Sequence, residues 1–334
     1  MKIRIMDISE RTGYSIATVS NALNNKPGVS RKASTEIFEA AQELGYVSGS
    51  KITRIRFVTF RKNGLIVDDA PFFRALIESV ESEARLCGYE MVFNTLFRDS
   101  SDFEAQLNAI KNDATSALIL LGTEMMEDDY VSFVDDTNPV VILDGWCNAT
   151  NFDCVIIDNT HAASQAASYL LDRGHTEIGY LKGKFRINNF VQRSVSFQHT
   201  LRKRNCPLQS KYVVRLTSTI EGAYQDMRCW LQSSPTLPTA FLADNDVIAL
   251  GALRALREVG YNVPGDISVI GFDDLIACEA SVPRLTTVHV FTQDMGRLAV
   301  RRLVDTIKNE YWLTKANICV CTKLVERDSV LDIR

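Results

Sequence analysis

Residues 7–24, DISERTGYSIATVSNALN, constrain the fold of this chain more than any other stretch. Two short helical patterns meet at Gly13, and the apolar positions of the second pattern recur at the spacing of an α-helix. Gly13 allows the positive φ of a tight corner between helices, and Ser15 can cap the second helix through its hydroxyl. This layout predicts a helix-turn-helix, whose second helix enters the major groove of DNA.

A third helix is expected to complete a small head. Ser30 can cap it, and Gly45 can end it in the left-handed conformation. Because three short helices make a small core, we assign these apolar residues to packing: Ile5, Ile8, Val19, Leu23, Phe38 and Leu44. The side chains expected to contact DNA are Arg4, Ser15, Ile16, Ala17, Thr18, Ser20, Asn21, Asn24, Ser30 and Lys32. Several of these, namely Thr18, Ser20, Asn24, Ser30 and Lys32, can donate to phosphates.

Charge is divided unevenly along the chain. Residues 1–56 hold nine basic and five acidic residues, a net charge of +4, whereas the whole chain has −4, so the remainder carries −8. A basic head on an acidic body suits phosphate contact by the head, although an excess of this size is also common on solvated surfaces. With 334 residues, of which 46% are hydrophobic, the chain is long enough for two or three domains.

Other features argue against export, membrane insertion and metal binding. No apolar run approaches 18 residues, and the start MKIRIMDISE has no apolar segment of the kind found in secretory signals. We therefore expect a cytoplasmic protein with no membrane span. The eight cysteines form no CxxC pair, so we expect reduced thiols in the core, with the alternating run 318–322 as a strand.

Strand and helix patterns alternate after residue 54. The expected strands are 55–60, 89–95, 117–121, 140–143, 178–181, 212–216, 240–242 and 267–270. The expected helices are 71–87, 159–173, 188–204, 220–232 and 245–259. This alternation predicts an α/β body of two doubly wound lobes with parallel sheets. Ligands bind such folds at the carboxyl ends of the strands, where the lobes face each other.

The head also resembles a known family. The run MDISERTGYSIATVSNALNNKPGVSRKASTEIFEAAQELGYV carries the D-[IV]-[AS] opening, G-x-S-x-x-T-V-S-x-A-L-N, a K-P-G-V-S loop and a closing L-G-Y. It resembles the DNA-binding head of the LacI/GalR family of bacterial repressors. The resemblance implies that positions 16, 17 and 21 face base edges. That family usually has Arg, suited to guanine, at the position of Asn21, whereas Asn favours bidentate contact with adenine.

The body resembles the periplasmic-binding-protein-like effector domain of the same family. The markers are HTEIGYL (175–181), FLADNDVIALGALRALREVG (241–260), VPGDISVIGFDD (263–274) and PRLTTVHV (283–290). The resemblance implies a helix-turn-helix domain at 1–47, a shortened linker at 48–54 and an effector domain at 55–334. Its N-lobe would span about 55–157 and 288–317, and its C-lobe about 158–287 and 318–334. No leucine heptad follows for a tetramer, so a homodimer is expected, associated with the nucleoid when bound to double-stranded operator DNA.

Position by position, the resemblance implies an effector site between the lobes. Its residues would be Phe72, Phe73, Asp144, Trp146, Lys182, Arg193, Asn245 and Asp273. Aromatic faces, an Arg fork and an Asp acceptor suit a carbohydrate-like effector. Alternatives remain for three residues: one Phe in the core, Asp273 as a helix cap, and Arg193 in a surface ion pair.

Two departures from the family pattern bear on the effector. Ser218 stands where relatives often have a stacking aromatic residue. Lys182, Lys184 and Arg186 replace a Gly-Gly-Pro-like run, so they either bind an anionic effector or are solvated on a loop. The effector is therefore expected to be a sugar, or a sugar-derived acid or phosphate.

The junction between head and body is short. Relatives follow L-G-Y with a segment that folds as a hinge helix on DNA and wedges a leucine into the minor groove. Here residues 46–56 read YVSGSKITRIR, shorter by roughly seven residues, about two helical turns. The segment is either a flexible tether or places Ile52 as a shortened wedge, and we expect the operator to be bent less than by relatives.

Two other classes of protein, enzymes and solute-binding receptors for transport, fit the sequence less well. The sequence has no HExxH, GxSxG or GxxxxGK[ST] motif, and its four histidines are dispersed, so no catalytic residue, cofactor or metal site is expected. A solute-binding receptor for transport would share the body fold but would have no use for a DNA-binding head. We therefore expect a transcriptional regulator whose operator affinity changes when the effector binds.

Overall fold

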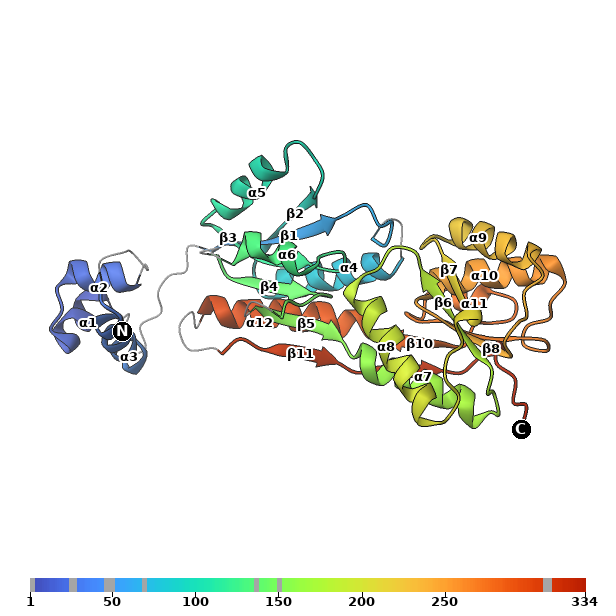
Figure 1. Ribbon diagram of the computed structural model, residues 1–334. Helices are drawn as coiled ribbons and strands as arrows, with labels where there is room; N and C mark the ends of the chain where they lie inside the picture. Colours follow the sequence, from blue (N-terminus) through green and yellow to red (C-terminus); the bar gives the residue numbers. More distant parts are fainter. Residues whose placement is uncertain are drawn as a thin grey trace.

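The computed structural model describes residues 4–23, 29–44, 52–67, 71–134, 138–148, 152–308 and 314–334. Figure 1 shows a helical head followed by a larger body in which strands and helices alternate. The predicted fold class, an all-α head followed by two parallel-sheet lobes, is confirmed. Within these residues, no helix combines the length and the apolar character needed to cross a lipid bilayer.

The head consists of α1 (Ile5–Thr12), α2 (Ile16–Leu23) and α3 (Arg31–Glu43). Gly13 is left-handed, with φ 75°, and Ser15 Oγ accepts a hydrogen bond from the Thr18 N–H at 3.0 Å. Ser30 Oγ accepts in the same way from the Ala33 N–H and caps α3. The apolar residues predicted to pack the head all belong to its core. The predicted end of α3 at Gly45 lies outside the described residues.

The N-lobe is built on a six-stranded parallel sheet in the order β11-β5-β4-β3-β1-β2. Its strands are β1 (Arg54–Arg61), β2 (Glu90–Phe97), β3 (Ser116–Leu121), β4 (Val140–Leu143), β5 (Asp153–Ile157) and β11 (Asn317–Val320). Successive side chains of β1 enter different cores: Phe57 packs in the core that includes α4 (Pro71–Leu86) and α12 (Thr292–Lys308), and Val58 in the core that includes α5 (Phe103–Lys111). This is the two-sided burial expected of a parallel sheet. The short α6 (Glu127–Tyr130) and η1 (Val131–Phe133) follow β3.

The C-lobe has a four-stranded parallel sheet in the order β7-β6-β8-β9. Its strands are β6 (Ile178–Gly183), β7 (Val213–Leu216), β8 (Ala240–Ala243) and β9 (Ser268–Ile270). The helix α7 (Asn159–Asp172) packs on α8 (Asn188–Lys203), and α9 (Ile220–Gln232) packs on α10 (Asp246–Val259). The short elements η2 (Ser210–Tyr212) and α11 (Ala277–Ala280) complete the lobe.

Three segments carry the chain between the lobes. The first joins β5 to α7, the second contains β10 (Thr287–Val290), and the third joins β11 to β12 (Thr322–Val325), which pairs antiparallel with β10. The single strand predicted at 318–322 is wrong, because it is two strands in different sheets with Cys321 between them. The alternation of exposed and half-buried residues continues from β11 into β12, so the sequence pattern alone does not reveal that the chain changes sheets there.

The eight cysteines are all free thiols. Cys154 and Cys278 are buried, as predicted, but those at 87, 229, 319 and 321 are exposed, so the expectation of core thiols is wrong for these four. Cys319 and Cys321 lie on the exposed face of the strands. An alternating sequence pattern distinguishes two faces of a strand but does not show which face is exposed to solvent.

Candidate functional site

The start of α2 faces solvent. Ile16 exposes 54% of its surface, Ala17 is exposed, and Asn21 lies one helical turn beyond Ala17 on the same face. Val19 and Leu23 on the opposite face are buried in the core of the head. The second helix of the corner therefore has one face for packing and one free for a partner. Asn24, also predicted to contact DNA, lies outside the described residues.

Polar contacts hold α2 in place. The Tyr14 hydroxyl donates to Glu36 Oε2 at 2.6 Å, which raises the pKa of Tyr14. Arg11 pairs with Glu43 at 3.1 Å and so ties α1 to α3. At the start of α1, the Arg4 N–H donates to Asp7 Oδ2 at 2.6 Å. The exposed face is thus presented by a small, internally braced unit.

A second candidate site is a cleft between the two lobes, which is nearly filled by side chains and has a free volume of only about 20 Å³. Its wall combines apolar side chains with a few polar ones. The lining residues are Ile66, Phe72, Phe73, Thr123, Asp144, Ile157, Ile187, Asn189, Phe190, Arg193, Asn245, Val247, Asp273 and Leu275. Such a lining, mostly apolar with converging polar groups, is typical of small-molecule sites.

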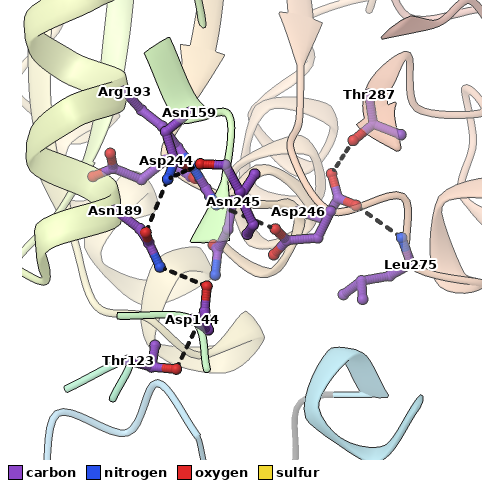
Figure 2. Close-up of polar contacts among 12 residues, drawn as sticks. Thr123, Asp144, Asn159, Asn189, Arg193, Asp244, Asn245, Asp246, Leu275 and Thr287 are labelled. Atoms are coloured by element: carbon purple, nitrogen blue, oxygen red, sulfur yellow. Dashed lines mark hydrogen bonds and ion pairs between the residues drawn. The ribbon is translucent and has the colours of Figure 1, made fainter. Parts of the chain in front are cut away.

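Figure 2 shows a chain of hydrogen bonds through this cleft. Asp144, at the end of β4, accepts from the Thr123 hydroxyl at 2.6 Å and from Asn189 Nδ2 at 2.9 Å. Asn189 Oδ1 accepts in turn from Asn159 Nδ2 at 2.9 Å. Asp144 belongs to the N-lobe and Asn189 to the first turn of α8 in the C-lobe, so this series of hydrogen bonds joins the two lobes.

Arg193 is the centre of the C-lobe wall. Its Nε donates to Asn159 Oδ1 at 2.7 Å, and its Nη1 donates to the backbone carbonyl of Asp244 at 2.6 Å. Its Nη2 lies 3.6 Å from Asp273 Oδ1, and the guanidinium stacks 3.5 Å from the centroid of the Phe272 ring. Only 3% of Arg193 is exposed, so it is not part of a surface ion pair.

Burial changes the proton affinity of the cleft carboxyls. It raises the pKa of Asp144 to about 6, against the opposing effects of the Thr123 hydrogen bond and the Arg193 charge. Burial also raises the pKa of Asp273 well above its usual range, although Arg193 opposes the shift. Among the described residues that line the cleft, burial thus shifts both carboxyl groups towards their neutral, protonated forms, whereas Arg193 is a guanidinium held by hydrogen bonds.

Comparison with known proteins bears on both sites. Residues 4–48 match the family model described as "Bacterial regulatory proteins, lacI family", and residues 167–330 match a "Periplasmic binding protein-like domain". An HTH-type transcriptional repressor PurR of Photorhabdus laumondii is 32% identical over 333 residues, which cover 98% of this chain and 97% of that protein. The chain belongs to the lacI family of bacterial regulatory proteins.

Solved structures of the family share the architecture. The transcriptional regulator CelR in complex with cellobiose aligns over 98% of this chain and 100% of its own, with a TM-score of 0.74 and 25% identity. The Lac repressor dimer bound to operator aligns over 99% of this chain and 100% of its own, with a TM-score of 0.73 and 22% identity. As a lacI-family member, the chain is a DNA-binding transcriptional regulator with a periplasmic-binding-protein-like domain.

Most of the residues that the family resemblance assigned to the effector line the lacI-type cleft. These are Phe72, Phe73, Asp144, Arg193, Asn245 and Asp273. Both Phe side chains are buried and lie edge to face with ring centroids 5.0 Å apart. Asn245 also caps α10, because its Oδ1 accepts from the Ile248 N–H. Asp273 points to Arg193 rather than to a helix end.

Two of the predicted effector residues are not part of the cleft lining. Trp146 is half-buried and packs against the second core of the N-lobe. Lys182 is half-buried in β6, where burial, followed by the charges of Arg186 and Arg215, lowers its pKa. The neighbouring loop cations have acidic partners in the C-lobe: Lys184 pairs with Asp226 at 2.6 Å, and Arg186 with Asp244.

Sequence reasoning missed two polar residues of the cleft lining, Thr123 and Asn189, and one residue behind it, Asn159. Asn189 could have been found, because it precedes Arg193 by four positions on a predicted helix and so shares its face. Thr123 follows a predicted strand closely enough to lie at the strand-end edge. Asn159 gave no such signal, since its role depends on α7 packing against α8.

Proposed function

We propose that this lacI-family protein is a transcriptional repressor that binds a pseudo-palindromic operator as a homodimer, one head in each of two successive major grooves. A small molecule bound in the interlobe cleft would change lobe closure and thereby operator affinity. The observation that carries the proposal is the combination, in one chain, of an exposed α2 face and a cleft walled by both lobes. Two relatives support it: the repressor PurR of Photorhabdus laumondii, and the Lac repressor dimer bound to operator.

For the effector we propose a neutral, hydroxyl-rich molecule such as a sugar. Asp144, Asp273 and Asn245 offer acceptors for ligand hydroxyls, Arg193 offers a donor, and Phe72 offers an apolar surface. An anionic ligand would have to compete for an arginine already engaged by Asp273 and by the backbone carbonyl of Asp244. The cellobiose complex of CelR is consistent with this class of ligand. The expected alternative, a sugar acid or phosphate held by Lys182, has less support because Lys182 does not line the cleft.

Genomic footprinting tests the proposed DNA-binding function, since the purified protein should protect discrete DNA sites with two-fold sequence symmetry. A thermal-shift screen then tests the effector with matched sets: a neutral sugar, its uronic acid and its phosphate. The neutral members should raise the melting temperature, since a ligand at 100 times its Kd stabilises by about 2.7 kcal/mol. If only the uronic acids and phosphates raised the melting temperature, the effector would be an anionic sugar derivative and not a neutral sugar.

The Asp273→Asn variant tests whether the ligands bind in the cleft. It should abolish the ligand-induced shift, because one of the two carboxyl oxygens beside Arg193 is replaced by an NH₂ group, which donates instead of accepting. Asp328→Asn is the matched control, since Asp328 pairs with Arg284 on the exposed surface of the same lobe. The control should respond to ligand as the wild type does, and equal loss in both variants would place the binding site elsewhere.

A further inference from the structure

Two loops, one from each lobe, touch beside the cleft. The first follows β1 and contains Gly64, and the second follows β6 and contains Phe185. A Cβ built on Gly64 would lie 2.2 Å from Phe185 Cδ1 and 2.7 Å from Phe185 Cγ. The aromatic ring therefore rests directly on the backbone of Gly64. Because the φ of Gly64 is not left-handed, the need for glycine is steric and comes from the ring.

The N-lobe loop is held in shape by a buried carboxylate. Glu124, which is 2% exposed, accepts from the backbone N–H groups of Lys62 at 2.6 Å, Gly64 at 3.4 Å and Ile66 at 3.2 Å. Asn63 and Leu65 on either side of Gly64 have φ values of 64° and 57°. Such left-handed residues persist where the surrounding structure over-determines them. The surface offered to Phe185 is thus preformed within the N-lobe.

The contact closes one side of the cleft. Ile66 and Ile187, which follow Gly64 and Phe185 in their loops, both line the cleft. Phe185 itself is half-buried and packs against the main core. A ring that leaves Gly64 would therefore expose the cleft wall at these two isoleucines.

We propose that Phe185 and Gly64 form an interlobe clasp, which holds the lobes together before any effector is bound. Effector entry and release then require the ring to leave the glycine. The role in effector exchange rests on the proposed function, but the clasp itself is a property of the ligand-free protein and is tested without a ligand.

A disulfide trap tests the clasp in the full-length protein. Because the Phe185 Cγ is 2.7 Å from the Cβ position at residue 64, the two Cβ atoms are no more than about 4.2 Å apart, within reach of a disulfide. Gly64→Cys combined with Phe185→Cys should crosslink when oxidised by glutathione disulfide, as detected by mass spectrometry of the linked peptides. The matched control combines Gly64→Cys and Lys184→Cys with Phe185→Ala, which removes the ring that a side chain at residue 64 would meet. It should not crosslink, since Lys184 points to Asp226.

Hydrogen exchange covers the case in which the double variant fails to fold. In ligand-free protein, Phe185→Ala should raise amide exchange in peptides covering 61–67 and 183–190 at least tenfold. Trp230→Leu, which disturbs packing against Phe241 in the same lobe, should leave these peptides unchanged. Absence of both the crosslink and the exchange difference would overturn the clasp, while footprinting and ligand shifts would still stand as tests of the proposed function.

Discussion

Asp144 illustrates how a single residue connects position, charge and regulation. It sits at a strand end with φ 57°, is 2% exposed, and contacts groups from both lobes. The hydroxyl and amide that bind it are uncharged donors, so they only partly replace the water that burial removes. The ionised form is therefore costly in the closed cleft.

We predict that Asp144→Asn stabilises the protein near neutral pH. A pKa raised from 3.8 to about 6 means that the folded state holds the proton more tightly, so stability falls as the pH rises between about 4 and 6. The asparagine is isosteric and can pair with the same two neighbours. It should remove up to about 3 kcal/mol of this cost above pH 6, with little gain at pH 4. Thermal unfolding at pH 4.5 and 7.5 checks this, and an equal effect at both values would contradict it.

Asn21 is expected to determine which base the head reads. If it contacts adenine bidentately, Asn21→Ala should cost about 1–3 kcal/mol in binding and relax the preference at one base pair of each half-site. Lys32→Ala is the comparison, since loss of a phosphate contact should weaken binding evenly across sequences. Binding to operator libraries at fixed salt separates the two. A preference for guanine unaffected by Asn21→Ala would refute this role.

At the scale of single residues, family resemblance predicted more of the cleft lining than could be predicted from each residue and its spacing alone. Arg193 and Asp273 came from family resemblance, and their pairing could not be read from spacing, because 80 positions separate them in the chain. Lys182 shows the limit: a basic residue on a strand-end loop was expected in the cleft, but its side chain does not line it. Which way a loop side chain turns depends on its tertiary partners.

At the scale of elements, the corner between α1 and α2 offers a clean test. Gly13 is left-handed, and apart from its chain neighbours no atom of the described residues lies within 4 Å of the Cβ that it lacks. Backbone conformation is therefore the reason for glycine there. Gly13→Ala should destabilise the head by about 1 kcal/mol, and Gly13→Asn by less, because asparagine tolerates this conformation. Differential scanning calorimetry with operator titration measures both. Equal effects of the two substitutions would show that the cost is not conformational.

Elements of the body were predictable where the pattern is strong. Buried strands such as β3 and the long helices α8 and α10 were expected close to their observed bounds, since apolar runs and helical periodicity are local signals. The division at Cys321 was not predictable in this way. The division depends on which sheet each of the two strands, β11 and β12, joins. Their partners lie more than 25 positions away in the chain: β11 pairs with β5, and β12 pairs with β10.

At the scale of the whole molecule, the short junction predicts weak operator bending. The family resemblance implies a segment roughly seven residues shorter than that of relatives, with no leucine at the wedge position, and we expect such a segment to unstack a base step less readily. Phased gel-shift assays should show less curvature than the Lac repressor produces on its own operator. Ile52→Ala is the control for the alternative, because a loss of bending in that variant would identify Ile52 as a shortened wedge.

The crossing of the chain at β11 has a consequence for synthesis. The C-lobe sheet, β6 to β9, is contiguous in the chain and complete once residue 270 has left the ribosome. The N-lobe starts earlier, yet it lacks α12 and its edge strand until residue 320 emerges. Domains normally fold in the order in which they are made. In this protein the N-lobe, which is begun first, waits for residue 320, and the C-lobe waits for the tail of the chain, because β9 also binds Ser329 and Leu331. The two lobes should therefore finish folding together, at the end of synthesis.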